Sequence, residues 1–145
     1  MTTSRLHELS ERGQSVWIDS ISREWLRGGF LAKLMREDAV VGVTSNTTIF
    51  QKALAEGDRY DDQLREVPAG ETDAKEIFYA LAVEDIKEAC DLLRPVWDAG
   101  GGLDGYVSME VDPTLAYERE ATIEEALRLH EWIDRPNLFV KIPAT

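Results

Sequence analysis

The sequence predicts an α/β protein built around a parallel sheet, on three observations. Four short segments are rich in branched and aromatic residues. Helical patterns separate these segments along the chain, so strands and helices alternate. Several of the segments, such as residues 138–140, are apolar at consecutive positions, which is typical of strands covered on both faces. Alternating strands and helices connect as right-handed crossover units, and such units form parallel sheets.

The predicted strands span residues 15–19, 39–44, 103–110 and 137–142. A first helix is predicted over residues 22–36, where Gly28 and Gly29 should weaken or bend it. A second follows over residues 72–97 before the glycines at 100–102, and Pro95 is expected to end it early. A third begins at a T-x-x-E capping box formed by Thr122 and Glu125, and Pro136 ends it.

Composition and charge exclude several classes of protein. The chain has 28 Asp and Glu against 16 Lys and Arg, a net charge of −12 over 145 residues, which does not favour nucleic acid or an anionic bilayer as a partner. The hydrophobic content of 43% is typical of globular chains. No stretch approaches the roughly 18 apolar residues of a membrane span, and residues 1–14 do not resemble a signal peptide. The single cysteine, Cys90, excludes an internal disulfide and fits a reducing compartment. We therefore expect one cytoplasmic domain over residues 1–145.

Polar side chains stand where the predicted strands end. Asp19 ends the first strand, Thr44 and Asn46 end the second, Glu110 ends the third, and Lys141 lies in the fourth. Catalytic groups gather at the carboxyl ends of strands in parallel α/β folds, so neighbouring strands would bring these side chains together.

Each of these residues also has a purely structural interpretation. Lys141 lies among apolar neighbours that disfavour a charged ammonium, so it can be a nucleophilic amine or a lysine that extends to solvent. Glu110 can be a general acid or base, or a cap of the following turn. Asp19, Asn46 and Asp112 can each cap the turn or helix that follows them. The residues alone leave both interpretations open.

One motif is more specific. Residues 41–50 read V-G-V-T-S-N-T-T-I-F and resemble the second strand of the transaldolases. Residues 16–19, 107–113 and 137–145 agree with the same family in order and spacing. The resemblance covers nearly the whole chain and is closest to the longer bacterial form of the family.

The resemblance implies a TIM (β/α)8 barrel enzyme of the pentose phosphate pathway. Such an enzyme transfers a dihydroxyacetone unit from a ketose phosphate, sedoheptulose 7-phosphate, to an aldose phosphate, glyceraldehyde 3-phosphate, with no metal or organic cofactor. It also implies that Lys141 forms the Schiff base, that Glu110 acts as acid and base through a water, and that Asp19 handles the hydroxyl proton during cleavage. Thr44 and Asn46 would hold the dihydroxyacetone unit.

The chain departs from the family at two points. Thr47 stands where the family usually has proline, which frees φ at this position and adds an N–H that needs a partner. Only about the first four of the eight βα units are present, so we expect a truncated barrel whose activity alone is doubtful, with sugar phosphates as substrates.

Three other hypotheses remain. An aldolase on the same scaffold would release dihydroxyacetone instead of transferring it. A metal enzyme would use Asp19, Glu110 and Asp112 as oxygen ligands of Mg²⁺. A catalytically dead fragment would self-associate through the open strand edges of the incomplete barrel.

Overall fold

The computed structural model describes residues 4–55, 58–68, 70 and 73–144. A sheet of four strands forms its centre: β1 (Val16–Ile18), β2 (Val40–Thr44), β3 (Tyr106–Glu110) and β4 (Leu138–Lys141). Neighbouring strands are parallel and follow the order of the chain, β1-β2-β3-β4. The prediction of an α/β fold with a parallel sheet is confirmed, and each strand is shorter than the segment predicted for it.

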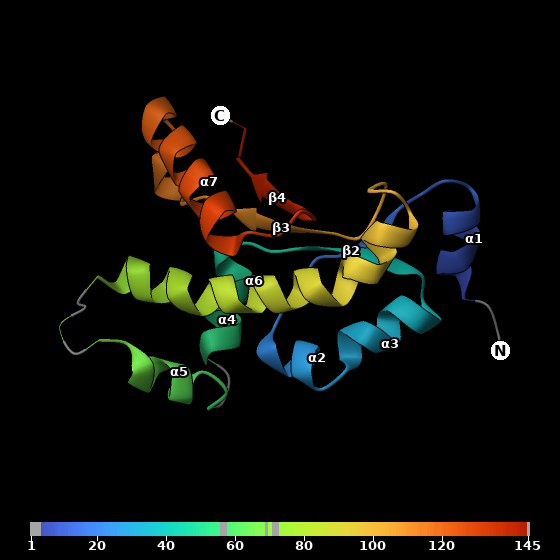
Figure 1. The fold of residues 1–145 in the computed structure, drawn as a ribbon, viewed down its shortest axis with the longest axis horizontal. Helices are drawn as coiled ribbons and strands as arrows, with labels where there is room; N and C mark the ends of the chain where they lie inside the picture. The colour runs from blue at the N-terminus through green and yellow to red at the C-terminus, as the bar shows by residue number, and fades with distance from the viewer. Residues whose placement is uncertain (1–3, 56–57, 69, 71–72, 145) are drawn as a thin grey trace.

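The connections between strands are helical. The helices are α1 (Arg5–Glu11), α2 (Arg23–Arg27), α3 (Phe30–Glu37), α4 (Thr47–Ala55), α5 (Asp61–Glu66), α6 (Ala74–Ala99) and α7 (Arg119–Ile133), with a short 3₁₀ turn, η1 (Pro113–Leu115). Helix α6 packs against β2 and β3, whereas α7 packs against β4 and α6. In Figure 1, α2, α3, α5 and α6 lie along one side of the strands.

The helix boundaries correct two predictions. The first predicted helix is divided at Gly28–Gly29 into α2 and α3, as the expected bend suggested. The prediction that Pro95 ends the second helix is wrong, because α6 continues to Ala99 with Pro95 inside it. Proline leaves the carbonyl of Asp91 without its helical hydrogen bond. Both residues are exposed, so water can reach this carbonyl.

The predicted capping box is also wrong. Helix α7 begins at Arg119, so Thr122 lies inside it and not at its N-cap. The Thr122 hydroxyl instead lies 2.8 Å from the Leu115 carbonyl oxygen and 2.9 Å from that of Glu118. Glu125 does not turn back to the helix terminus, because its carboxylate accepts hydrogen bonds from outside α7.

The two faces of the sheet differ in character. Alternate side chains of the strands, including Val43, Val107, Met109 and Leu138, are buried in the core that α6 and α7 cover. The other face carries stacked rings: the Tyr106 and Phe139 centroids lie 4.0 Å apart and those of Trp17 and Phe139 6.2 Å apart. Phe139 is 48% exposed.

Gly42 of β2 lies beneath the Trp17 ring on this aromatic face. A Cβ atom at position 42 would come within 2.3 Å of the ring, so only glycine lets the indole lie flat against β2. By strand alternation the same face carries Asp19, Thr44, Glu110 and Lys141. The aromatic layer therefore lies on the face that holds the predicted site.

Candidate active site

The ends of β3 and β4 bring together two of the predicted site residues. Their register places Glu110 directly opposite Lys141. The Lys141 Nζ lies 3.1 Å from the Glu110 Oε1, with the lysine side chain 47% exposed and the glutamate side chain 12% exposed. An amine and a carboxylate within hydrogen-bond reach can exchange a proton directly.

Asp19 and Thr44 connect the ends of β1 and β2. The Thr44 hydroxyl donates a hydrogen bond of 2.5 Å to the Asp19 Oδ1. Asp19 is exposed, and this bond orients its carboxylate, whose Oδ2 accepts no hydrogen bond from the residues that the structure describes. Thr44 therefore acts on this group of residues by orienting the Asp19 carboxylate.

Asn46 caps α4, as one of the two sequence interpretations proposed. Its Oδ1 accepts a hydrogen bond of 2.9 Å from the Ile49 backbone N–H. The cap fixes the side chain and leaves its Nδ2 without a hydrogen bond among the residues that the structure describes. Asn46 is thus placed as a cap and can still donate to a ligand.

An open cavity of about 660 Å³ joins these strand ends. Four of the predicted residues line it: Asp19, Asn46, Glu110 and Lys141. The other lining residues come from α4 and from the start of η1: Thr47, Thr48, Ile49, Lys52 and Pro113. Thr44 is not among the lining residues.

Sequence analysis missed Lys52, which adds a second cation to the cavity wall. It lies on α4, where residues 48 and 52 are one helical turn apart and share a face. The signal in the sequence was the four-residue spacing between Thr48 and Lys52, which places both on one face of a helix. It could be used only once the start of α4 was known.

Asp112 does not join this group. Its Oδ1 accepts hydrogen bonds from the Thr114 N–H and hydroxyl and caps η1, while its Oδ2 lies 3.0 Å from the Lys75 Nζ. Within the described part of the chain, no three His, Cys, Asp or Glu side chains are gathered as they would be to hold a metal ion. The Mg²⁺ hypothesis, which needs Asp112 beside Asp19 and Glu110, therefore has no geometric support.

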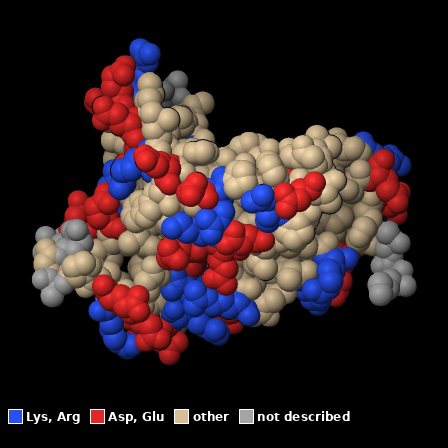
Figure 2. Space-filling model, viewed as in Figure 1, with Lys and Arg blue, Asp and Glu red and all other residues tan. Residues whose placement is uncertain are grey.

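The helical layer holds a separate buried ion pair. The Arg23 Nε lies 2.8 Å from the Asp85 Oδ1, and the Tyr60 hydroxyl donates to the Asp85 Oδ2 at 2.6 Å. Burial raises the pKa of Asp85, although Tyr60 and Arg23 oppose this shift. Elsewhere on this face, acidic and basic side chains are intermixed over the helices (Figure 2). Arg23, Tyr60 and Asp85 do not line the cavity at the strand ends.

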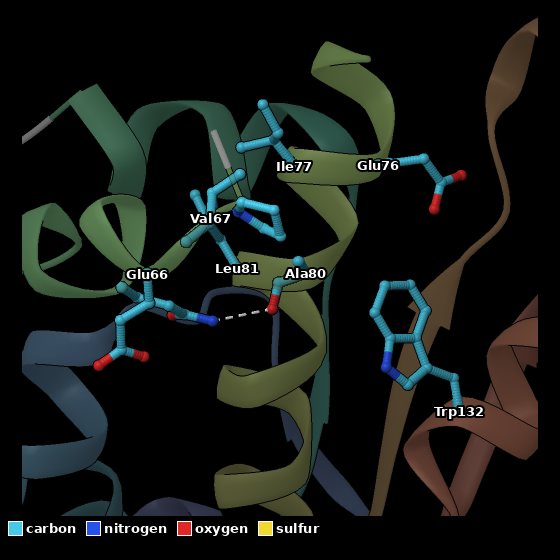
Figure 3. A pocket seen from close by; sticks show the side chains of 9 residues that line it. Glu66, Val67, Glu76, Ile77, Ala80, Leu81 and Trp132 are labelled. Carbon is cyan, nitrogen blue, oxygen red and sulfur yellow. Dashed lines mark hydrogen bonds between the residues drawn. The ribbon is translucent and has the colours of Figure 1, made fainter. Parts of the chain in front are cut away.

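A second cavity, of about 360 Å³, lies among the helices (Figure 3). Ile77 and Leu81 of α6, Val67 after α5 and Trp132 of α7 form its apolar walls. A hydrogen bond of 3.0 Å from the Gln63 Nε2 to the Ala80 carbonyl crosses one side. This cavity contains none of the predicted site residues.

No helix in the described ranges is both long enough and apolar enough to cross a membrane.

Comparison with known proteins identifies the family of the chain. The sequence model of the Transaldolase/Fructose-6-phosphate aldolase family matches residues 16–145. A transaldolase of Frankia alni is 56% identical over 140 residues, and one of Acidothermus cellulolyticus is 54% identical over 143 residues. These alignments cover 97% and 99% of this chain but only 38% of each relative.

A transaldolase of Thiobacillus denitrificans is 50% identical over 138 residues, which cover 95% of this chain and 38% of that protein. The chain thus spans little more than a third of the length of these curated relatives, and it supplies four neighbouring strands where a complete barrel has eight. The chain belongs to the transaldolase/fructose-6-phosphate aldolase family of α/β barrels and forms an N-terminal part of such a barrel.

Proposed function

We propose that this chain carries the imine-forming half of a transaldolase site. The reaction moves a dihydroxyacetone unit from a ketose phosphate, such as sedoheptulose 7-phosphate, to an aldose phosphate, such as glyceraldehyde 3-phosphate, in the pentose phosphate pathway. The observation that carries this proposal is the contact of 3.1 Å between the Lys141 Nζ and the Glu110 Oε1, at the end of two neighbouring strands.

The first step is formation of an imine on Lys141. An ammonium nitrogen must lose a proton before it can attack the ketose carbonyl carbon, and the Glu110 Oε1 lies 3.1 Å from the Lys141 Nζ. Glu110 is the group in contact to accept this proton. Glu110 then returns this proton to the carbinolamine hydroxyl, directly or through a water. The hydroxyl leaves as water and the C=N bond forms.

The second step breaks a carbon–carbon bond. Asp19 takes the proton from the hydroxyl group next to the bond, a carbonyl forms there, and the bonding electrons move into the imine. The products are a free aldose and an enamine that retains the three-carbon unit on Lys141. The Thr44 hydroxyl holds the Asp19 carboxylate in the orientation that this transfer needs.

The third step reverses the second with a new aldose. The enamine carbon attacks the acceptor aldehyde, Asp19 returns its proton to the new alkoxide, and water hydrolyses the imine to regenerate Lys141. Asn46 is positioned to donate its free Nδ2 to a hydroxyl of the three-carbon unit. Lys52, the second cation at this cavity, favours anionic substrates.

Borohydride trapping tests this proposal on the 145-residue chain. The chain is treated with dihydroxyacetone and borohydride, and intact and peptide masses are measured. We expect one adduct, on Lys141, that is absent from Lys141→Ala. The matched control is Lys52→Ala, which removes the other cation at the cavity and should retain the adduct. Labelling spread over surface lysines, or equal labelling of Lys141→Ala, would contradict the proposal.

Product analysis separates a transaldolase from an aldolase on the same site. A transaldolase transfers the three-carbon unit to an added aldose phosphate, whereas an aldolase releases free dihydroxyacetone. We propose that transfer needs strands beyond the four described here, since the chain covers 38% of its relatives. Imine formation needs only the groups already present.

A second candidate is a catalytically inactive partial barrel that self-associates. Two observations favour it: in the part of the chain that the structure describes, β1 and β4 each have one edge without a neighbouring strand, and Phe139 on the open face is 48% exposed. Sedimentation that depends on concentration, together with no adduct on Lys141, would support this function. A monomer that carries the adduct would contradict it.

A further inference from the structure

The segment that follows β3 is held by a cluster of four side chains, of which sequence analysis gave Asp112 and Glu125 other roles. Lys75, in the first turn of α6, places its Nζ 3.0 Å from the Asp112 Oδ2 and 3.1 Å from the Glu125 Oε2. The Glu125 Oε1 accepts hydrogen bonds from the Tyr79 hydroxyl at 2.7 Å and from the Asp112 backbone N–H at 3.2 Å. One carboxylate and one ammonium thus hold both the backbone and the side chain of Asp112.

This cluster lies next to the proposed active site. Asp112 is separated from Glu110 only by Val111, which is 1% exposed and donates its N–H to the Lys141 carbonyl at 3.2 Å. Pro113, the next residue after Asp112, lines the cavity with Glu110 and Lys141. Residues 110–113 are therefore held by β4 on one side and by α6 and α7 on the other.

The charges of the cluster depend on one another. Burial pushes the pKa of Glu125 upward, but the hydrogen bonds from Tyr79 and Lys75 outweigh it and hold that pKa below its usual range. The same balance lowers the pKa of Asp112, where Thr114 and Lys75 outweigh burial. Burial and the Glu125 carboxylate raise the pKa of Tyr79, so its hydroxyl remains a donor. Without the Lys75 ammonium, two neighbouring carboxylates would repel each other.

We propose that Lys75, acting with Glu125 and Tyr79, is a positioning residue that fixes the segment after β3 and so keeps the Glu110 carboxylate beside Lys141. This inference rests on the proposed imine chemistry. Proton transfer between Glu110 and the reacting nitrogen requires hydrogen-bond distance, and a displacement of about 1 Å can lower a rate by about a hundredfold. None of the three residues lines the cavity, so they act through the backbone of residues 111 and 112.

The structure offers a matched control in Tyr60, which precedes α5 and contacts α6. Tyr60 donates to the buried Asp85 of α6 at 2.6 Å, as Tyr79 donates to Glu125 at 2.7 Å, and both tyrosines are 3% exposed. The Tyr60 pair lies in the helical layer and, within the described part of the chain, makes no hydrogen bond to residues 110–113. Tyr79→Phe and Tyr60→Phe therefore each remove one buried phenolic hydroxyl that donates to a carboxylate.

The first measurement is the rate of borohydride trapping on Lys141 at increasing dihydroxyacetone concentration. We expect Lys75→Met and Tyr79→Phe to lower the maximal rate by about tenfold to a hundredfold, with the half-saturating concentration unchanged. Lys75→Arg keeps the cation and should restore most of the rate. Tyr60→Phe should change stability and leave the maximal rate as it is. Equal rate losses in the two Phe variants would overturn the positioning role.

The second measurement does not depend on activity. Amide hydrogen exchange should show faster exchange at Val111 and Asp112 in Lys75→Met than in the unmodified chain or in Tyr60→Phe. Unchanged protection at these two amides would overturn the proposal, as would lost protection with an unchanged trapping rate. If the unmodified chain forms no adduct on Lys141, the proposed function fails, while the exchange data still decide whether Lys75 fixes this segment.

Discussion

At the scale of single residues, position 47 offers the clearest local test. Thr47 is the first residue of α4, directly after the capping residue Asn46. Proline is favoured at the first position of a helix, where the missing N–H is not needed and φ is already suitable. Thr47→Pro should therefore raise the free energy of unfolding by about 0.5–1 kcal/mol, mainly by restricting the unfolded chain.

Urea unfolding of Thr47→Pro measures this effect, with Thr47→Ala as the control for loss of the hydroxyl. The variant should leave Lys141 trapping intact, because the Asn46 side chain keeps its bond to the Ile49 N–H. A destabilised Thr47→Pro would show that the threonine N–H or hydroxyl has a structural partner here.

The candidate site shows what single residues could reveal in advance. The strand ends were enough to predict that Lys141, Glu110 and Asp19 lie close together, because the carboxyl ends of neighbouring parallel strands meet at one edge of the sheet. The role of Glu125 could not be predicted in this way. Its hydroxyl donor, Tyr79, is 46 residues away in sequence, and the local T-x-x-E pattern offered a nearer partner that the fold does not use.

At the scale of elements, the turn from α6 into β3 depends on Gly105. This residue has φ +88°, and a Cβ there would lie 2.5 Å from the Trp97 backbone nitrogen and 2.9 Å from the Leu93 carbonyl oxygen. Its own carbonyl accepts a hydrogen bond of 2.8 Å from the Asn137 Nδ2. The end of α6, the start of β3 and the residue before β4 therefore meet at Gly105, where there is no room for a side chain.

Gly105→Ala should lower the free energy of unfolding by the strain of a left-handed alanine, about 1–2 kcal/mol, plus about 1–3 kcal/mol of overpacking. Gly101→Ala is the matched control, because Gly101 has φ +61° and nothing within 4 Å of a Cβ. Chemical denaturation of both variants isolates the packing contribution. Equal losses would mean that the contact with Trp97 relaxes freely.

The elements themselves were mostly predictable, and the failures have a common cause. Apolar runs located all four strands, and Gly28–Gly29 marked a bend at the point where the single predicted helix is divided into α2 and α3. Pro95 failed as a helix end because α6 is held by nine buried residues against the sheet and its neighbours, and tertiary packing of this kind exceeds a local proline penalty of about 3 kcal/mol. Local signals thus located the strands and the longer helices but not the short helices α1 and α5, and packing determined where α6 ends.

At the scale of the whole molecule, Cys90 reports whether α6 stays docked on the sheet. The thiol is 0% exposed in the core, and its Sγ lies 4.0 Å from the Asn137 carbonyl at the start of β4. Burial raises the pKa of Cys90 to about 12, whereas an exposed thiol has a pKa of about 8.5. At pH 8 the native thiol is therefore both inaccessible and protonated, and it reacts only after α6 separates from the strands.

This chain contains half of the strands of a barrel, so the decisive question for the molecule is whether four strands and their helices form a stable core alone. We expect iodoacetamide at pH 8 to label native Cys90 at least about a thousandfold more slowly than the urea-unfolded chain, as for a folded domain with an unfolding free energy above about 5 kcal/mol. Gly105→Ala should raise the native rate in proportion to its loss of stability. Native labelling as fast as in urea would mean that the core opens freely, and that the strand ends around Lys141 need the remaining strands to hold their arrangement.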